Sequence, residues 1–173
     1  SWASDLVAGD TNGSSDIFVR DRQNGTTERV SLATGGAQGD RDSSAQVSIS
    51  SDGRFVAFAS RASNLVAGDT NFTWDVFVHD RDNDHDGIYD ESAPGATRTW
   101  RASLSSVGVQ ANADSGQYGL WLSAFGRYVV FQSNAWNLIA NDMNGSDIFV
   151  HDNVNGATVL VSLSHTKDYA AAM

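Results

Sequence analysis

Short apolar runs separated by polar turns recur along the whole chain. The motif at 8–21, AGDTNGSSDIFVRD, returns at 67–80 and, one residue shorter, at 140–152. The copies are spaced by 59 and then 73 residues, and most of the 14-residue excess lies in one acidic segment, residues 82–96. A repeat of this size indicates an architecture built from repeated supersecondary units.

Each unit is expected to contain four short strands. The first is predicted at 46–50 and 119–123, the second at 55–59 and 128–131, the third at 17–19, 76–78 and 148–150, and the fourth near 28–32, 100–104 and 159–163. The second and third strands are apolar at consecutive positions, which indicates strands covered on both faces. A two-sheet sandwich would instead show alternation. The pattern therefore favours an all-β fold of β-propeller blades, which are stacked four-stranded antiparallel sheets.

The repeat predicts one domain over residues 1–165, followed by a tail at 166–173. The domain divides into a partial blade (1–43), a blade that carries the acidic insertion (44–112) and a last blade (113–165). Closed propellers have about four to eight blades. About two and a half blades leave apolar faces open, so we expect a homo-oligomer or the remainder of a longer propeller.

Two strings carry a family resemblance. SSDGRFVAFAS at 50–60 and DVFVHD at 75–80 resemble the TolB-type, WD40-like propeller repeat of bacterial secreted and periplasmic proteins. The resemblance covers nearly the whole chain and implies a secreted or periplasmic bacterial protein. It implies the fold more than an activity, because this family includes both partner-binding and enzyme-associated domains.

Composition narrows the classes of function. The 173 residues include 21 acidic and 11 basic side chains, for a formal net charge of -10. This charge argues against nonspecific binding to nucleic acid or anionic membranes and permits binding of cations. The chain has no cysteine, which excludes disulfide and thiolate chemistry. No apolar run reaches the roughly 20 residues of a membrane span, and no signal peptide is expected.

The acidic insertion has the spacing of a calcium loop. It places carboxylates at loop positions 1, 3, 5 and 9, Gly87 at position 6 and a backbone carbonyl at position 7, as in the front half of an EF-hand. Position 12 is Ala93 rather than Glu, so the spacing resembles thrombospondin type 3 calcium loops more than a full EF-hand. The alternative is a solvated acidic loop. The predicted calcium ligands are Asp82, Asp84, Asp86, Ile88, Asp90 and Glu91.

The repeated motif offers a second set of oxygen ligands. Asp10, Asn12 and Asp16 lie at i, i+2 and i+6 and resemble the calcium loops of FG-GAP repeats in integrin-type propellers. The matching positions are Asp69, Asn71 and Asp75 in the second copy and Asp142, Asn144 and Asp147 in the third. Asp, Asn and Gly are also the residues that tight turns select, so structural turns are the alternative.

Histidine and serine give no catalytic signature. No Gly-x-Ser-x-Gly elbow and no phosphate-binding glycine loop occurs. His79 and His151 share a repeat position with Arg20, which predicts a solvated strand end rather than a metal ligand. His85 is expected to be exposed.

The leading interpretation is a calcium-stabilised binding or scaffold module. One alternative is a propeller hydrolase that uses calcium to polarise an ester, lactone or phosphotriester. In that case the candidate channel-lining residues are Gln46, Ser48, Trp121 and Ser123. A further alternative is a carbohydrate-binding module that stacks sugars on exposed tryptophans, with Trp74 and Trp100 as departures from the repeat.

Overall fold

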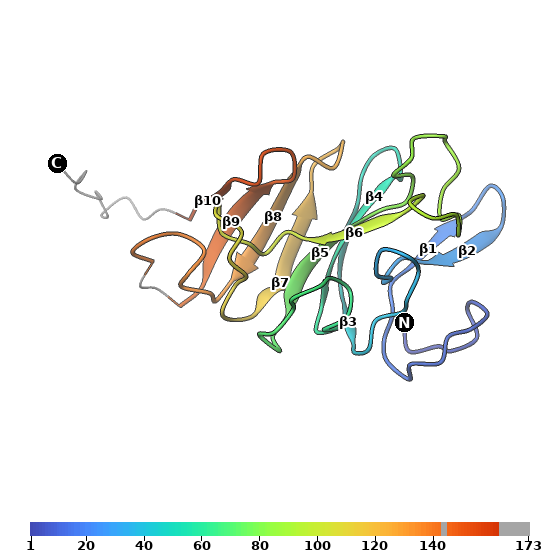
Figure 1. Ribbon diagram of the computed structural model, residues 1–173, viewed down its shortest axis with the longest axis horizontal. Coiled ribbons are helices and arrows are strands. Elements are labelled where there is room, and N and C mark those ends of the chain that lie inside the picture. The colour runs from blue at the N-terminus through green and yellow to red at the C-terminus, as the bar shows by residue number, and fades with distance from the viewer. Residues whose placement is uncertain (143–144, 163–173) are drawn as a thin grey trace.

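The computed structural model describes residues 1–142 and 145–162, except the side chains of residues 44 and 45 (Figure 1). The described residues form ten strands in antiparallel sheets and contain no helix, which confirms the predicted all-β class. The first sheet contains β1 (Phe18–Asp21) and β2 (Thr26–Arg29). The second contains β3 (Ser43–Ile49), β4 (Phe55–Ser60), β5 (Asp75–Asp80) and β6 (Arg98–Arg101). The third contains β7 (Ser115–Leu122), β8 (Tyr128–Ser133), β9 (Asp147–Asp152) and β10 (Thr158–Leu160).

The two four-stranded sheets have the same order, in which each strand pairs with its neighbours along the chain. The three sheets follow one another along the long axis of the molecule (Figure 1). The fourth strands begin and end earlier than predicted, because Leu32 and Leu104 instead form isolated bridges with Gln38 and Gln110 in the connection to the next sheet. The first strands begin earlier, at Ser43 and Ser115, and each contains a register shift.

The second sheet is covered on both faces, as its consecutive apolar residues predict. Every residue of β5 is buried. Val56, Phe58 and Phe77 pack with Ile17 and Val30 of the first repeat. The neighbouring positions, which include Ala57, Val76 and Val78, pack with Leu120, Phe131 and Phe149 of the third sheet. Burial of these side chains, worth about 1.5–3 kcal/mol for each large one, holds the sheets together.

Two glycines allow the second and third sheets to approach closely. A Cβ atom on Gly116 would lie 2.6 Å from Cγ2 of Val76. A Cβ atom on Gly126 would lie 2.3 Å from Cδ2 of Phe55, and both glycines have positive φ angles. Only glycine combines this backbone conformation with such close contacts.

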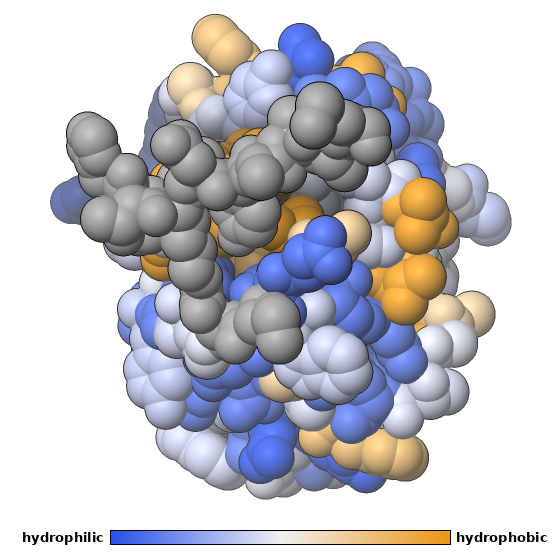
Figure 2. Space-filling view, turned by 90° about the vertical axis from the view of Figure 1, so that its left-hand side faces the viewer, coloured by the Kyte–Doolittle hydropathy of each residue, from blue (hydrophilic) through white to orange (hydrophobic). Residues whose placement is uncertain are grey.

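Within residues 1–142 and 145–162, the third sheet is covered on one face only. Val129, Phe131 and Phe149 face the second sheet and are fully buried. On the other face β10 exposes Val159, and Val161 beyond it is also about half exposed. Figure 2 views this end of the molecule, where apolar and polar surface lie side by side. No helix among the described residues is long and apolar enough to cross a membrane.

Candidate metal site

Three carboxylates converge in the acidic insertion, directly after the buried strand β5. Oxygens of Asp82, Asp84 and Asp86 all lie within 4.8 Å of one another. Asp82 is buried, whereas Asp84 and Asp86 are exposed. This aspartate cluster is the only group of three or more possible metal ligands at this spacing in the part of the chain that the structure describes.

Backbone amides of the loop donate hydrogen bonds to the carboxylates of the cluster. The amide of Gly87 donates to Oδ1 of Asp82 (3.3 Å), and the amide of Ile88 donates to Oδ1 of Asp86 (2.8 Å). Gly87 has a φ of 86°, a conformation that most other residues avoid. The predicted glycine at position 6 therefore has the role that a tight ligand loop requires.

Two arginines bind aspartates just before the insertion and in its middle. Arg54 donates from Nε and Nη2 to the two carboxylate oxygens of Asp80 (2.7 and 2.6 Å). Arg81 binds the carboxylate of Asp90 in the same way and also donates to the carbonyl of Gly53 (2.7 Å). Such bidentate pairs fix geometry as well as charge. Asp90, a predicted calcium ligand, thus forms an ion pair with Arg81 and lies outside the aspartate cluster.

The other two predicted ligands lie in the same loop. The pKa of Glu91 is raised, first by desolvation and then by the negative charges of the aspartate cluster, so its carboxylate lies within their electrostatic reach. Ile88 is exposed and follows the glycine turn. His85 is exposed, as predicted, and its Nδ1 lies 2.8 Å from Nη1 of Arg54. A divalent cation would relieve the repulsion between the carboxylates.

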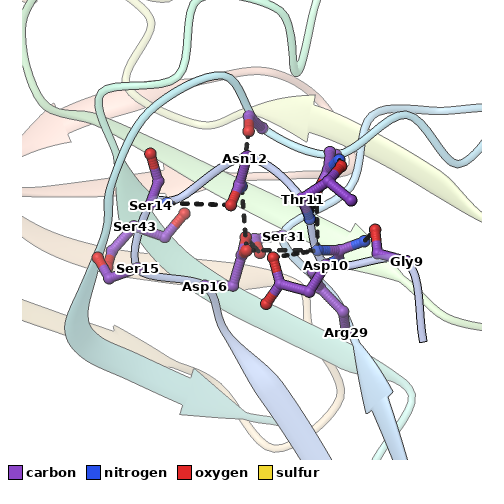
Figure 3. Close-up of polar contacts among 12 residues, drawn as sticks. Gly9, Asp10, Thr11, Asn12, Ser14, Ser15, Asp16, Arg29, Ser31 and Ser43 are labelled. Carbon is purple, nitrogen blue, oxygen red and sulfur yellow. Dashed lines mark hydrogen bonds and ion pairs between the residues drawn. The ribbon is translucent and has the colours of Figure 1, made fainter. Parts of the chain in front are cut away.

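The first repeated loop is neutralised by an arginine (Figure 3). Nη1 of Arg29 lies 3.1 Å from Oδ1 of Asp10 and 3.4 Å from Oδ2 of Asp16. Asn12 donates to Oδ2 of Asp16 (3.0 Å), and the hydroxyl of Ser31 donates to its Oδ1. The three predicted ligands thus come together, with a guanidinium group as their cation.

The second loop repeats this arrangement residue for residue. Nη2 of Arg101 lies 3.0 Å from Oδ2 of Asp69, and its Nε lies 3.8 Å from Oδ2 of Asp75. Asn71 donates to Oδ2 of Asp75 (2.9 Å), and Ser103 donates to Oδ1. Burial raises the pKa of Asp75 to about 6, against the opposing effect of Arg101.

Sequence reasoning missed both arginines. They stand in matching strings, RVSL at 29–32 and RASL at 101–104, and both pair with a phenylalanine of the preceding strand. That shared string was the available signal. We call the two sites the arginine-bound loops. Metal binding there stays a prediction of the sequence, whereas the contacts account for these residues without an ion.

The third loop differs at the decisive position. Leu160 occupies the register of Arg29 and Arg101, opposite Phe149. Asp142 and Asp147 are buried, and Asn144 lies outside the described residues. Ser162 donates to Oδ1 of Asp147 (2.6 Å), but Oδ2 is buried and has no hydrogen-bond partner within residues 1–142 and 145–162.

The prediction of solvated histidines was wrong for both members of the repeat position. His79 and His151 are buried, and their Nδ1 atoms lie 2.8 Å from the hydroxyls of Thr99 and Thr158. Burial lowers the pKa of His79 to about 4 and also lowers that of His151. Arg20, at this position of the first sheet, is exposed, whereas the histidines at the same position of the second and third sheets are buried. Equivalent positions of the repeat therefore differ in exposure.

The proposed channel-lining residues have structural contacts. The hydroxyl of Ser48 accepts from the amide of Leu122 (3.0 Å), and that of Ser123 accepts from the amide of Tyr128 (2.9 Å). Gln46 is partly buried and Trp121 is exposed.

Two other tryptophans are partly buried. Trp74 and Trp100 both belong to the second copy of the repeat. Trp100 packs edge-on against Phe55 and donates to Asn153 (2.9 Å). Packing between sheets therefore accounts for Trp100.

No protein-family model matches this chain, and no curated protein is significantly similar to it. The functional proposal therefore rests on the geometry of the aspartate cluster and on the stacked sheets.

Proposed function

We propose that the chain is a calcium-stabilised binding or scaffold module of β-propeller type, from a secreted or periplasmic bacterial protein. The observation that carries the proposal is the aspartate cluster, three carboxylates within 4.8 Å at the end of a buried strand. Two like-ordered four-stranded sheets and a related two-stranded sheet support blades. The described residues leave one face of the third sheet for a second copy or for the rest of a propeller.

Calcium fits the donor set better than a transition metal does. The cluster offers only carboxylate oxygens, with Glu91 nearby, whereas zinc and copper sites use histidine or cysteine. His85 belongs to the loop but contacts Arg54. Two of the three carboxylates are exposed, which leaves room for the water ligands that calcium accepts.

The proposed ion has a structural role. It would tie the first part of the insertion together, while Arg54 binds Asp80 just before the insertion and Arg81 binds Asp90 in its middle. The described contacts favour neither the hydrolase nor the sugar-binding alternative. The serine hydroxyls of the candidate channel serve backbone contacts.

Thermal unfolding in calcium and in chelator tests the proposal. Calcium at a hundredfold excess over its Kd stabilises by about 2.7 kcal/mol, which raises the Tm by about 5–10 °C for a chain of this size. The double variant Asp84→Asn with Asp86→Asn should lose this shift. In chelator it should be at least as stable as the wild type, because it lacks the carboxylate repulsion.

Asp5→Asn is the matched control, because Asp5 is an exposed aspartate outside the cluster. It should keep the full calcium shift. A wild-type Tm that is the same in calcium and chelator would contradict the proposal. A shift that survives in the double variant would move the ion away from the aspartate cluster.

A further inference from the structure

The first sheet has an open edge beside β1. In the second and third sheets the corresponding strands, β5 and β9, have a neighbour on each side. Among the ten described strands, β1 pairs only with β2. An unpaired strand edge presents a row of backbone donors and acceptors to any strand that can approach it.

One backbone pair, between Ser1 and Asp16, already lies along this edge. Ser1 donates from its amino group to the carbonyl of Asp16 (2.7 Å), and its own carbonyl accepts from the amide of Asp16 (2.9 Å). The same pairing joins Ser60 with Asp75 in the second sheet, where it continues along six residues of β4 and β5. Because backbone groups alternate in direction, Phe18 and Arg20 point their amides and carbonyls to the same side as Asp16.

Two apolar side chains of β3 occupy the repeat positions that a preceding sheet covers in β7. Val47 and Ile49 of β3 are 46% and 48% exposed. Their counterparts by register are Leu120 and Leu122 of β7. Leu120 is only 3% exposed, because the second sheet packs against β7. The part of the second sheet that covers Leu120 has no counterpart in the first sheet.

We propose that this place is a binding site for a β-hairpin with the pattern of β3 and β4. One strand of the hairpin pairs with β1 from the Ser1–Asp16 pair onward, and the hairpin covers Val47 and Ile49. Strand addition of this kind obtains affinity from backbone hydrogen bonds and specificity from the side chains on the covered face. A second copy that paired edge to edge with β1 would satisfy the backbone but leave the two apolar side chains of β3 in water.

An extended chain tests the site directly. A second copy of residues 43–59, SSAQVSISSDGRFVAFA, is joined to Ser1, so that alanine precedes Ser1 as Ala59 precedes Ser60. We expect the amides of Phe18 and Arg20 to exchange at least about tenfold more slowly with solvent, and the Tm to rise by several degrees. The extended chain should remain a monomer by light scattering.

Two matched variants make the result specific. Ala57→Asp in the added copy places a charge against the second sheet, because Ala57 itself faces the next sheet. Ile49→Asp in the original chain places a charge on β3, where the added hairpin would cover it. Each should remove most of the gain. Unchanged exchange at Phe18 and Arg20 would overturn the proposal, and so would an unextended dimer in which these amides are already protected.

Discussion

The arginine-bound loops and the aspartate cluster contain the same acidic residue type but differ in what neutralises its charge. In both, carboxylates with one to five residues between them converge in a loop next to a strand. In the loops before β1 and β5 an arginine from the neighbouring strand lies between them. In the insertion the nearby arginines bind Asp80 and Asp90 instead, and the three cluster aspartates form no ion pair among the described residues.

The difference shows that spacing alone does not specify a metal site. The deciding feature is whether the fold brings a cationic side chain to the carboxylates. A buried carboxylate needs such a partner, because desolvation of an unpaired charge costs several kcal/mol. In the cluster two of the three carboxylates are exposed, which lowers this cost and leaves room for an ion, and the buried one, Asp82, accepts a hydrogen bond from the amide of Gly87.

The strongest test of this comparison removes the arginine of the second loop. Arg101→Met leaves Asp69 and Asp75 buried without their cation, and we expect a loss of about 3–5 kcal/mol in the free energy of unfolding. Denaturant unfolding at neutral pH measures the loss. The linear methionine side chain keeps the aliphatic packing over Phe77, and the change also removes the hydrogen bond from Arg101 to Gln110.

Arg127→Met is the matched control. Arg127 also binds an aspartate, Asp152, but its side chain is half exposed. The Asp152 side chain is buried, but solvent reaches the pair from the arginine side, so we expect a loss closer to that of a surface pair, about 1 kcal/mol. Equal losses in the two variants would show that the buried arginine has no special role and would break the comparison.

A buried group in the strand after that loop avoids charge instead of neutralising it. His79 has a pKa lowered to about 4, against 6.5 in the unfolded chain, because burial disfavours its charged form. Above pH 6.5 the histidine is neutral in both the folded and the unfolded state, and its titration costs no stability. As the pH falls from 6.5 toward 4, only the unfolded state takes up the proton, so the free energy of unfolding decreases. The difference amounts to about 3 kcal/mol.

His79→Asn separates this effect from the titration of the carboxylates. Asparagine retains a hydrogen bond to Thr99 but does not titrate. Unfolding measured at pH 7 and at pH 4 should show a drop for the wild type that exceeds the drop for the variant by about 3 kcal/mol. The same drop in both chains would mean that His79 does not contribute to acid sensitivity.

Much of the fold was visible in the sequence because it depends on local pattern. The consecutive apolar residues of β4 and β5 predicted burial on both faces, and β5 is buried at every position. The Asp-Gly turn before Phe55 fixed the hairpin of β3 and β4. Strand ends were less visible, because Leu32 and Leu104 are apolar but pair outside their sheets.

The candidate site was only half visible. Ligand spacing identified Asp82, Asp84 and Asp86, since neighbours in a short loop stay close in space. The spacing could not show that Asp90 binds Arg81, because this contact depends on how the insertion folds back on itself. It also could not show that Arg29 reaches Asp16, because this contact depends on the register of β1 and β2. His79 was assigned to solvent because the first copy has arginine there, and the copies differ in how neighbouring sheets cover them.

The smallest predicted effect converts the third loop into an arginine-bound loop. Leu160→Arg places a guanidinium opposite Phe149, in the register of Arg29 and Arg101. Oδ2 of Asp147, buried and without a hydrogen bond in the described part of the chain, is then its target. Part of the lost leucine packing is retained by the aliphatic stem of the arginine, so we expect a net gain of about 1 kcal/mol in unfolding free energy.

A double-mutant cycle with Asp147→Asn decides whether the gain comes from this contact. In that background Leu160→Arg should give no gain, because its anionic partner has been removed. Leu160→Met, which keeps the volume without the charge, should change stability by less than about 1 kcal/mol in either background. If Leu160→Arg destabilises both backgrounds alike, the leucine is needed for packing, and the third loop is not a vacant version of the other two.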